Sequence, residues 1–196
     1  NLKAAKQFFI KKGKEYNVDD IIIKTGIPCF VKPNKSGSSF GISKVSDKAL
    51  LNEKIDYAFR EGDEVLVESF LEGKEVSVGV INIDGKRTIL PITEIRSKNE
   101  FFDFNAKYNG ESDEITPGEL TTNEVTDLHK MINTIYDKIN LSGITRSEII
   151  LVDGIPHLLE TNTIPGFTKQ SIVPQQIEAA GLSIKEIIEN QIKSLL

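Results

Sequence analysis

The chain has 196 residues, of which 24 are Lys or Arg and 29 are Asp or Glu, and its formal net charge is −5. This length is enough for one large domain or two small ones with real cores. An acidic balance provides no overall basic field, so we expect no nucleic-acid partner. No apolar run has the length of a membrane helix and no apolar leader opens the sequence, so we expect a cytoplasmic protein without a membrane partner. The single cysteine, Cys29, excludes an internal disulfide and a multi-cysteine zinc site.

Two short strands and a helix are predicted in the first part of the chain. The apolar runs at 8–10 and 29–32 are typical of strands. Apolar residues recur at helical spacing over 46–60, so we expect a helix there, capped by Ser46 or Asp47. Further strands are predicted at 64–70 and 76–83, followed by a turn at Asp84-Gly85 and a strand at 87–90.

The second half combines helices with a hairpin. Apolar stripes predict amphipathic helices at 125–139 and 183–196. Regular structure is least expected at 105–122 and 163–170, which are polar and contain glycine. Together these elements predict an α+β fold, in which helices cover mostly antiparallel sheets in two lobes.

The most informative segment is 143–162. Two strand-like runs, 144–151 and 157–162, predict a hairpin that closes over a three-residue loop centred on Gly154. In that register two opposed pairs share one face of the hairpin: Glu148 with Glu160, and Arg146 with Asn162.

Directly opposed carboxylates repel each other unless a cation lies between them. Two carboxylates and an amide oxygen are hard ligands that suit Mg²⁺ or Mn²⁺, with phosphate oxygens completing the shell. The alternative is a solvent-facing sheet surface on which acidic residues happen to be opposed.

Two other segments could bind a nucleotide. The loop at 33–41 follows an apolar strand that ends with Lys32, and its glycines and serines can bring backbone N–H groups and hydroxyls to phosphate. The strand at 64–70 runs into an acidic segment, whose backbone could hydrogen-bond an adenine edge while a carboxylate holds ribose. A flexible turn with a surface lysine, and an ordinary linker, are the alternatives.

Taken in order, these segments resemble the D-alanine–D-alanine ligase family of the ATP-grasp superfamily. The resemblance runs from about residue 8 to the C-terminus, and its last motif is the most specific. It rests on Phe30-Val31-Lys32-Pro33, on 37–43, on 67–76, on Ala106-Lys107-Tyr108 and on the run from Glu160 to Thr168.

The resemblance implies an ATP-grasp fold, with a nucleotide cleft between two lobes of mostly antiparallel sheet. It implies a central subdomain at 1–72 and a C-terminal subdomain at 73–196. The family's further N-terminal domain, which helps to hold the first substrate, has no counterpart in these residues, so we expect the chain alone to be inactive as a ligase.

The resemblance also implies a role for each matching residue. ATP would be bound through its phosphates, adenine and ribose by Lys32, Ser36, Gly37, Ser39, Glu68, Ser69, Leu71, Glu75 and Lys107. Catalysis would use Arg146 for the oxyanion and acyl phosphate, Lys107 and Tyr108 in a mobile loop, Ser38 bonded to Tyr108, and Gly166 and Ser171 for the second substrate. Two Mg²⁺ ions (or Mn²⁺) would be held by Glu148, Glu160 and Asn162, although the family's usual motif has Asp where this chain has Glu148.

The implied reaction joins two D-alanines for peptidoglycan synthesis. ATP phosphorylates the carboxylate of the first D-alanine, and the amine of the second attacks the acyl phosphate. D-alanine is then the small-molecule partner, and the resemblance allows a homodimer in the full-length enzyme. Alternatives are a relative that joins D-alanine to D-lactate or D-serine, against which Tyr108 argues, and a non-catalytic ATP-binding module.

Overall fold

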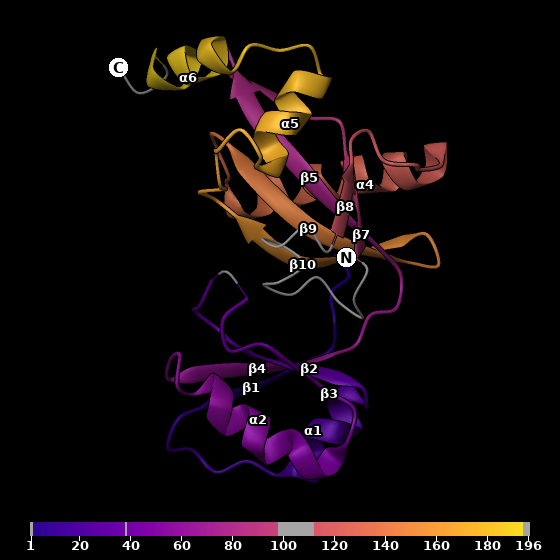
Figure 1. Cartoon of the computed structure of the whole chain (residues 1–196), viewed down its shortest axis with the longest axis vertical. Coiled ribbons are helices and arrows are strands. Elements are labelled where there is room, and N and C mark those ends of the chain that lie inside the picture. The colour runs from indigo at the N-terminus through magenta and orange to yellow at the C-terminus, as the bar shows by residue number, and fades with distance from the viewer. Residues whose placement is uncertain (1, 38, 98–111, 194–196) are drawn as a thin grey trace. The chain divides into compact units, whose positions relative to one another are not determined.

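The chain forms two compact units in the computed structural model, which describes residues 2–37, 39–97 and 112–193 (Figure 1). The first, here called the four-stranded unit, is Ala5–Leu71. The second, the six-stranded unit, consists of residues 2–4, Glu72–Arg96 and the described residues from Ser112 onward. Helices accompany antiparallel sheets in both units, which confirms the predicted α+β class.

The four-stranded unit has an antiparallel sheet of order β1-β4-β2-β3, with both of its α-helices packed on one face. Its elements are β1 (Gln7–Lys11), α1 (Val18–Thr25), β2 (Cys29–Pro33), β3 (Ser43–Val45), the 3₁₀ turn η1 (Lys48–Leu50), α2 (Leu51–Ala58) and β4 (Glu64–Ser69). Alternate residues of the strands, such as Val31 and Val67, are fully buried against the helices. The intervening residues, which include Lys32 and Glu68, therefore lie on the opposite face.

The predicted strands of this unit are confirmed, and the predicted helix is shorter than expected. It begins as the 3₁₀ turn, which Asp47 caps by accepting a hydrogen bond from the backbone N–H of Ala49 at 2.9 Å. Helix α1 was not predicted, although its signals are in the sequence. Asn17 caps it by accepting from the N–H of Asp19 at 2.7 Å, and Gly26, with φ of +75°, ends it.

The six-stranded unit has the strand order β10-β9-β5-β7-β8, with β6 paired to β5. Its strands are β5 (Lys74–Ile83), β6 (Lys86–Ile89), β7 (Thr93–Ser97), β8 (Ser112–Ile115), β9 (Thr145–Val152) and β10 (Ile155–Asn162). Its helices are α4 (Thr122–Ile139), α5 (Ile172–Ala179) and α6 (Ile184–Lys193).

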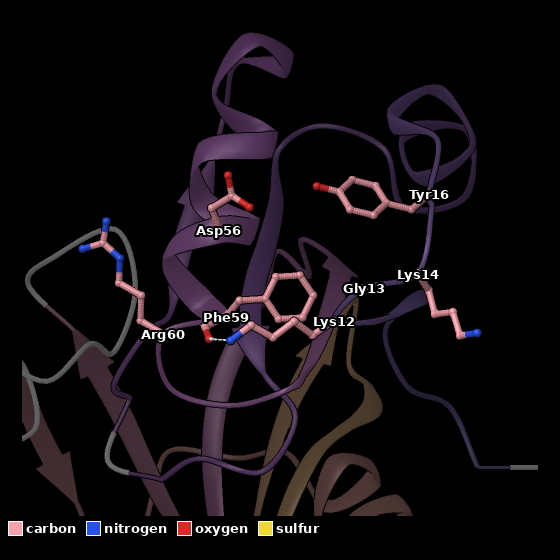
Figure 2. Close-up of a pocket in the computed structure, with 7 residues that line it drawn as sticks. All are labelled: Lys12, Gly13, Lys14, Tyr16, Asp56, Phe59 and Arg60. Carbon is pink, nitrogen blue, oxygen red and sulfur yellow. Dashed lines mark hydrogen bonds between the residues drawn. The ribbon is translucent and has the colours of Figure 1, made fainter.

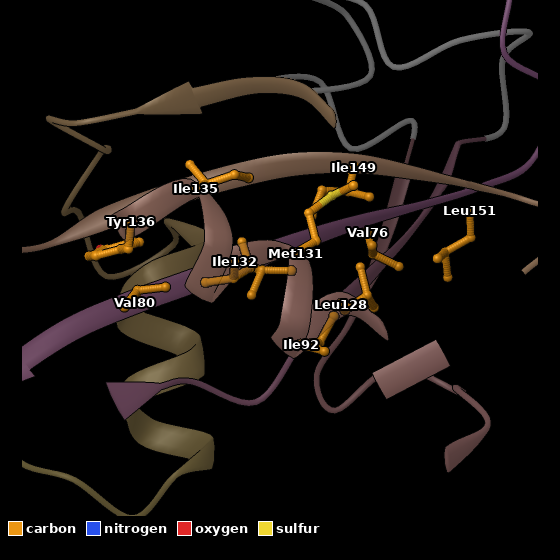
Figure 3. Packing of buried hydrophobic residues seen from close by; sticks show 11 residues of the cluster. Val76, Val80, Ile92, Leu128, Met131, Ile132, Ile135, Tyr136, Ile149 and Leu151 are labelled. Atoms are coloured by element: carbon orange, nitrogen blue, oxygen red, sulfur yellow. The ribbon is translucent and has the colours of Figure 1, made fainter. Parts of the chain in front are cut away.

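Successive side chains of β5 point to opposite faces of this sheet, and different helices pack on the two faces. Val76 and Val80 pack with Leu128 and Ile132 of α4 (Figure 3), and Val78 belongs to the same cluster. The other side of β5 contributes to a second cluster with α5 and α6, formed by Ile81, Leu90, Val173, Ile177 and Ile187. The face that α5 and α6 cover, called the α5 face below, is the one on which β5 carries Ser77 and Gly79.

The predicted helices at 125–139 and 183–196 are confirmed as α4 and α6. A capping box begins α4, in which Thr121 and Glu124 bond each other's backbone N–H. The expectation of irregular structure at 105–122 is wrong for β8, because an edge strand of four residues gives too short a pattern to detect. Helix α5 was also missed. Among the described residues, no helix is both long and apolar enough to cross a membrane.

Candidate active site

The β9–β10 hairpin confirms the predicted pairing but not the predicted loop. Val152 pairs with Ile155, so the loop has two residues, Asp153 and Gly154, with φ of +50° and +76°. Two successive positive φ values are typical of a tight hairpin turn.

A β-bulge in β10 compensates for the loop being one residue shorter than predicted. The pairing shifts between Leu158 and Glu160, which leaves Leu159 as one extra residue in β10. Beyond this bulge Glu160 pairs with Glu148 and Asn162 with Arg146, as predicted. Because Glu148 also pairs with Ser77 of β5, these side chains belong to the α5 face.

Arg146 supplies a positive charge to Glu148, one of the two opposed carboxylates. Its Nε donates to Oε1 of Glu148 at 2.6 Å, and the two side chains are 16% and 9% exposed. The other oxygen of Glu148, Oε2, is buried and has no hydrogen-bond partner among the described residues. A buried carboxylate oxygen without a partner is costly, so this atom favours a ligand that supplies positive charge.

The donor set fits a hard divalent cation. Glu160 is exposed, and Asn162 Oδ1 accepts from the N–H of Ile164 at 3.0 Å, which orients its side chain. No group of three or more His, Cys, Asp or Glu that could hold a metal ion occurs in the described part of the chain. The predicted metal ligands, Glu148, Glu160 and Asn162, do not form such a group because only two of them are carboxylates. Phosphate oxygens are expected to provide the remaining ligands.

Gly166 and Ser171, which the sequence predicted for one substrate, do lie together in the loop before α5. Ser171 Oγ accepts from the N–H of Thr168 at 3.1 Å and is 2.9 Å from Thr168 Oγ1. A Cβ at residue 166 would lie 3.1 Å from Ser171 Oγ, tighter than most contacts, which favours glycine there. Ser171 stands at the N-cap position of α5 without capping it, so its hydroxyl belongs to the loop.

Gln176, which the sequence analysis did not single out, fixes α5 on the sheet. It is fully buried, and its Nε2 donates to the carbonyl of Ser77 at 2.9 Å and to Thr93 Oγ1 at 3.0 Å. A Cβ on Gly79 would lie 2.1 Å from Gln176 Oε1, so this contact requires glycine. The sequence feature that could have indicated this residue is the pair of glutamines, Gln175 and Gln176, inside an otherwise apolar run.

The four-stranded unit brings Lys32 and Glu68 together. Lys32 Nζ lies 2.5 Å from Glu68 Oε2, and Gln7 Nε2 donates to Glu68 Oε1 at 2.8 Å. Phe30 is paired with Glu68 across β2 and β4, and Lys44 lies over the ring of Phe70 at 4.7 Å. This face therefore combines aromatic rings with lysines, which suits a flat ring that carries phosphates.

The other residues predicted for ATP are spread over both units. Ser69 Oγ accepts from the N–H of Lys6 at 3.0 Å, and Leu71 ends the four-stranded unit. Glu75 belongs to β5 of the six-stranded unit. Ser36, Gly37 and Ser39 lie in the loop after β2, where Ser39 has φ of +58°. The predicted residues Ser38, Lys107 and Tyr108 lie outside the described residues.

A cavity of about 390 Å³ elsewhere in the four-stranded unit contains none of the predicted site residues. Its basic lining does not converge: Arg60 and Lys14 project on opposite sides, and Lys12 Nζ donates to the carbonyl of Phe59 at 3.3 Å (Figure 2). Asp56 adds an opposing charge. This cavity therefore lacks the focused charge of an anion site.

Comparison with known proteins identifies relatives of the whole chain. Residues 4–193 match the family model described as D-ala D-ala ligase C-terminus. The D-alanine–D-alanine ligase of Flavobacterium johnsoniae is 48% identical over 98% of this chain and 59% of its own length, and that of Christiangramia forsetii is 45% identical over 100% and 60%. The chain thus spans about three fifths of these relatives.

Solved structures agree in fold. The VanG D-Ala:D-Ser ligase of Enterococcus faecalis superimposes with a TM-score of 0.86 at 31% identity, covering 98% of this chain and 57% of that one. The D-alanine–D-alanine ligase of Bacillus anthracis gives 0.80 at 31% identity, covering 98% and 63%. These neighbours have the ATP-grasp fold that the resemblance implied. The chain belongs to the family of D-alanine–D-alanine ligase C-terminal domains.

Proposed function

We propose that this chain is the ATP-binding and catalytic part of an enzyme that joins two D-alanines to D-alanyl-D-alanine, for peptidoglycan synthesis. The observation that carries the proposal is the α5 face at β9 and β10, where Arg146 holds one oxygen of Glu148 and the other has no described partner. A relative from Bacillus anthracis, 28% identical over 98% of this chain with a TM-score of 0.79, has been solved as a complex with ATP.

ATP would be bound by the residues that the resemblance assigns to it. Lys32 would neutralise phosphate, with Ser36, Gly37 and Ser39 beside it. Glu68, Ser69 and Leu71 would line the adenine edge, and Glu75 would bind ribose. Lys107, Tyr108 and Ser38 would complete the site. In this proposal residues 1–72 and 73–196 act as two subdomains of a longer protein.

Glu148, Glu160 and Asn162 would hold Mg²⁺, which would neutralise phosphate charge when bound. Glu148 has one more methylene than the family's usual aspartate at this position. The 2.6 Å bond from Arg146 holds the Glu148 carboxylate in place, which supports a role for this residue in binding a cation.

The chain's own residues would mainly position charge. Arg146 would stabilise the acyl phosphate of the first D-alanine and the oxyanion that forms when the second amine attacks it. Ser171 and the backbone at Gly166 would hold the second D-alanine by its carboxylate. The Thr168 hydrogen bonds would keep that hydroxyl in place.

The test is ligation by the full-length protein that contains this chain. ADP release that depends on D-alanine, together with recovered D-alanyl-D-alanine, is expected for wild type, and Arg146→Lys should lower kcat by about a hundredfold. Exposed Lys169→Arg is the matched control and should keep wild-type kcat. ATP binding without D-alanine-dependent ADP release would instead indicate a non-catalytic ATP-binding module.

A further inference from the structure

A carboxylate of β8, Glu114, joins the α5 face although no motif indicated it. Its Oε2 accepts from Gln175 Nε2 at 3.3 Å, and the same amide nitrogen donates to the carbonyl of Gln170 at 2.9 Å. Gln175 also donates its backbone N–H to the carbonyl of Ser171. Glu114 is therefore tied to the helical turn that directly follows the substrate loop.

The charge of Glu114 is poorly compensated. The side chain is partly buried, and within the described residues no ion pair joins it to a basic side chain. Burial raises the pKa of Glu114, the Gln175 hydrogen bond and Arg146 act to lower it, and Glu148 acts to raise it. A carboxylate that is partly removed from water and forms no ion pair is stabilised by a ligand that brings positive charge.

The position of Glu114 indicates which positively charged group it could bind. Glu114 interacts electrostatically with Arg146 and Glu148, where the acyl phosphate is proposed to form, and it is tied to the turn after Ser171, which is proposed to hold the acceptor's carboxylate. The amine and carboxylate of an α-amino acid are attached to one carbon. An acceptor anchored at Ser171 with its nitrogen directed toward the acyl group would bring that nitrogen near Glu114.

We infer that Glu114 binds the ammonium group of the acceptor amino acid, which makes it a residue that selects an amino acid over a hydroxy acid. This inference rests on the proposed ligase function. A hydroxy acid such as D-lactate has no ammonium group, so it would leave the carboxylate of Glu114 without its partner. Sites built to bind a polar group reject analogues that lack it, because the site's own group then stays unpaired.

The decisive variant is Glu114→Gln in the full-length enzyme. Its amide oxygen can still accept from Gln175, so the link between β8 and α5 is kept while the charge is removed. We expect the KM for D-alanine as acceptor to rise by about tenfold or more, with the KM for ATP changed by less than about twofold. The preference for D-alanine over D-lactate, measured by competition for product, should fall by a similar factor.

Three further variants separate charge from structure. Asp113→Asn removes an exposed carboxylate from the same strand and should leave the acceptor KM unchanged. Gln175→Met removes the hydrogen bond but keeps the charge, and should change the D-alanine preference by less than about threefold. Glu114→Asp keeps the charge and should retain that preference, which also provides a readout if Glu114→Gln does not fold.

Failure of this inference is distinguishable from failure of the proposed function. A wild-type enzyme without D-alanine-dependent ADP release would contradict the proposed function and this inference with it. A wild-type ligase whose Glu114→Gln variant keeps both its acceptor KM and its D-alanine preference would overturn this inference alone. So would a Gln175→Met variant that loses the preference as fully as Glu114→Gln.

Discussion

Glu68 in the four-stranded unit and Glu148 in the six-stranded unit are both buried and paired with a cation, but their carboxylate oxygens are not equally satisfied. Glu68 in the four-stranded unit uses both oxygens, since Gln7 donates to Oε1 and Lys32 lies 2.5 Å from Oε2. Glu148 in the six-stranded unit uses Oε1 for Arg146, while Oε2 has no partner among the described residues. The two residues are 5% and 7% exposed, so burial does not explain the difference.

Of these two clusters, only the one at Glu68 has partners for both carboxylate oxygens among the described residues. A buried oxygen without a partner costs about 1 to 3 kcal/mol. The Glu68 cluster avoids that cost, and it can therefore be fixed before any ligand arrives. The Glu148 cluster bears it, and a cation that binds Oε2 would recover it. We therefore expect the Glu68 cluster to be the better satisfied of the two without a ligand. We expect the Glu148 cluster to gain more stability when a cation binds.

The largest effect is expected when Arg146 is replaced by Met. Glu148 would then be buried with neither oxygen paired, and removing one partner of a buried ion pair typically costs about 3 to 5 kcal/mol. Urea unfolding should show a loss of about 3 kcal/mol. Adding Glu148→Gln to this variant should restore part of that loss, and a single-variant loss below about 1 kcal/mol would contradict the account.

Lys32→Met is the matched change in the four-stranded unit and should cost less, about 2 kcal/mol. Glu68 would keep the hydrogen bond from Gln7, and the Lys32 side chain is 20% exposed, so water can compensate in part. The same urea experiment measures it. If Lys32→Met costs as much as Arg146→Met, the proposed difference between the two clusters is wrong.

The smallest effect concerns the pH dependence of stability at Glu114. Burial raises the pKa of this group above its usual value, so the folded state binds its proton more tightly than the unfolded state does. Its contribution to stability is therefore present below that value and lost as the pH rises through the folded pKa. Glu114→Gln should thus gain stability relative to wild type between about pH 4 and pH 7, measured by urea unfolding. A difference that does not change with pH would contradict the assigned burial.

Local patterns in the sequence were sufficient for much of the fold. Periodicity identified the long helix α4 and the longer strands, whose buried faces repeat over many residues. Helix α5 was missed because its eight residues contain Pro174 and the buried Gln176, which disguise a helical stripe. Strand β8 was missed because its role depends on its neighbour β7 in the sheet and on no pattern of its own.

Local sequence patterns were less sufficient for the candidate site than for the fold. Opposition of Glu148 and Glu160 was predicted from a loop length that was wrong, and it holds because the bulge at Leu159 compensates. A bulge has no reliable sequence signal, so that agreement was partly fortunate. Glu114 could not be predicted at all, because its relation to Gln175 joins residues 61 positions apart through tertiary packing.

The binding of Mg²⁺ at Glu148 is the central claim, and thermal unfolding with a non-hydrolysable ATP analogue tests it most directly. With the full-length protein, adding Mg²⁺ to the analogue should raise the wild-type Tm further, because a ligand that binds only the folded state stabilises it. Glu148→Gln should lose that Mg²⁺-dependent increment and keep the increment from the analogue alone, whereas the exposed-site control Glu178→Gln should keep both. An undiminished Mg²⁺-dependent increment in Glu148→Gln would contradict the account.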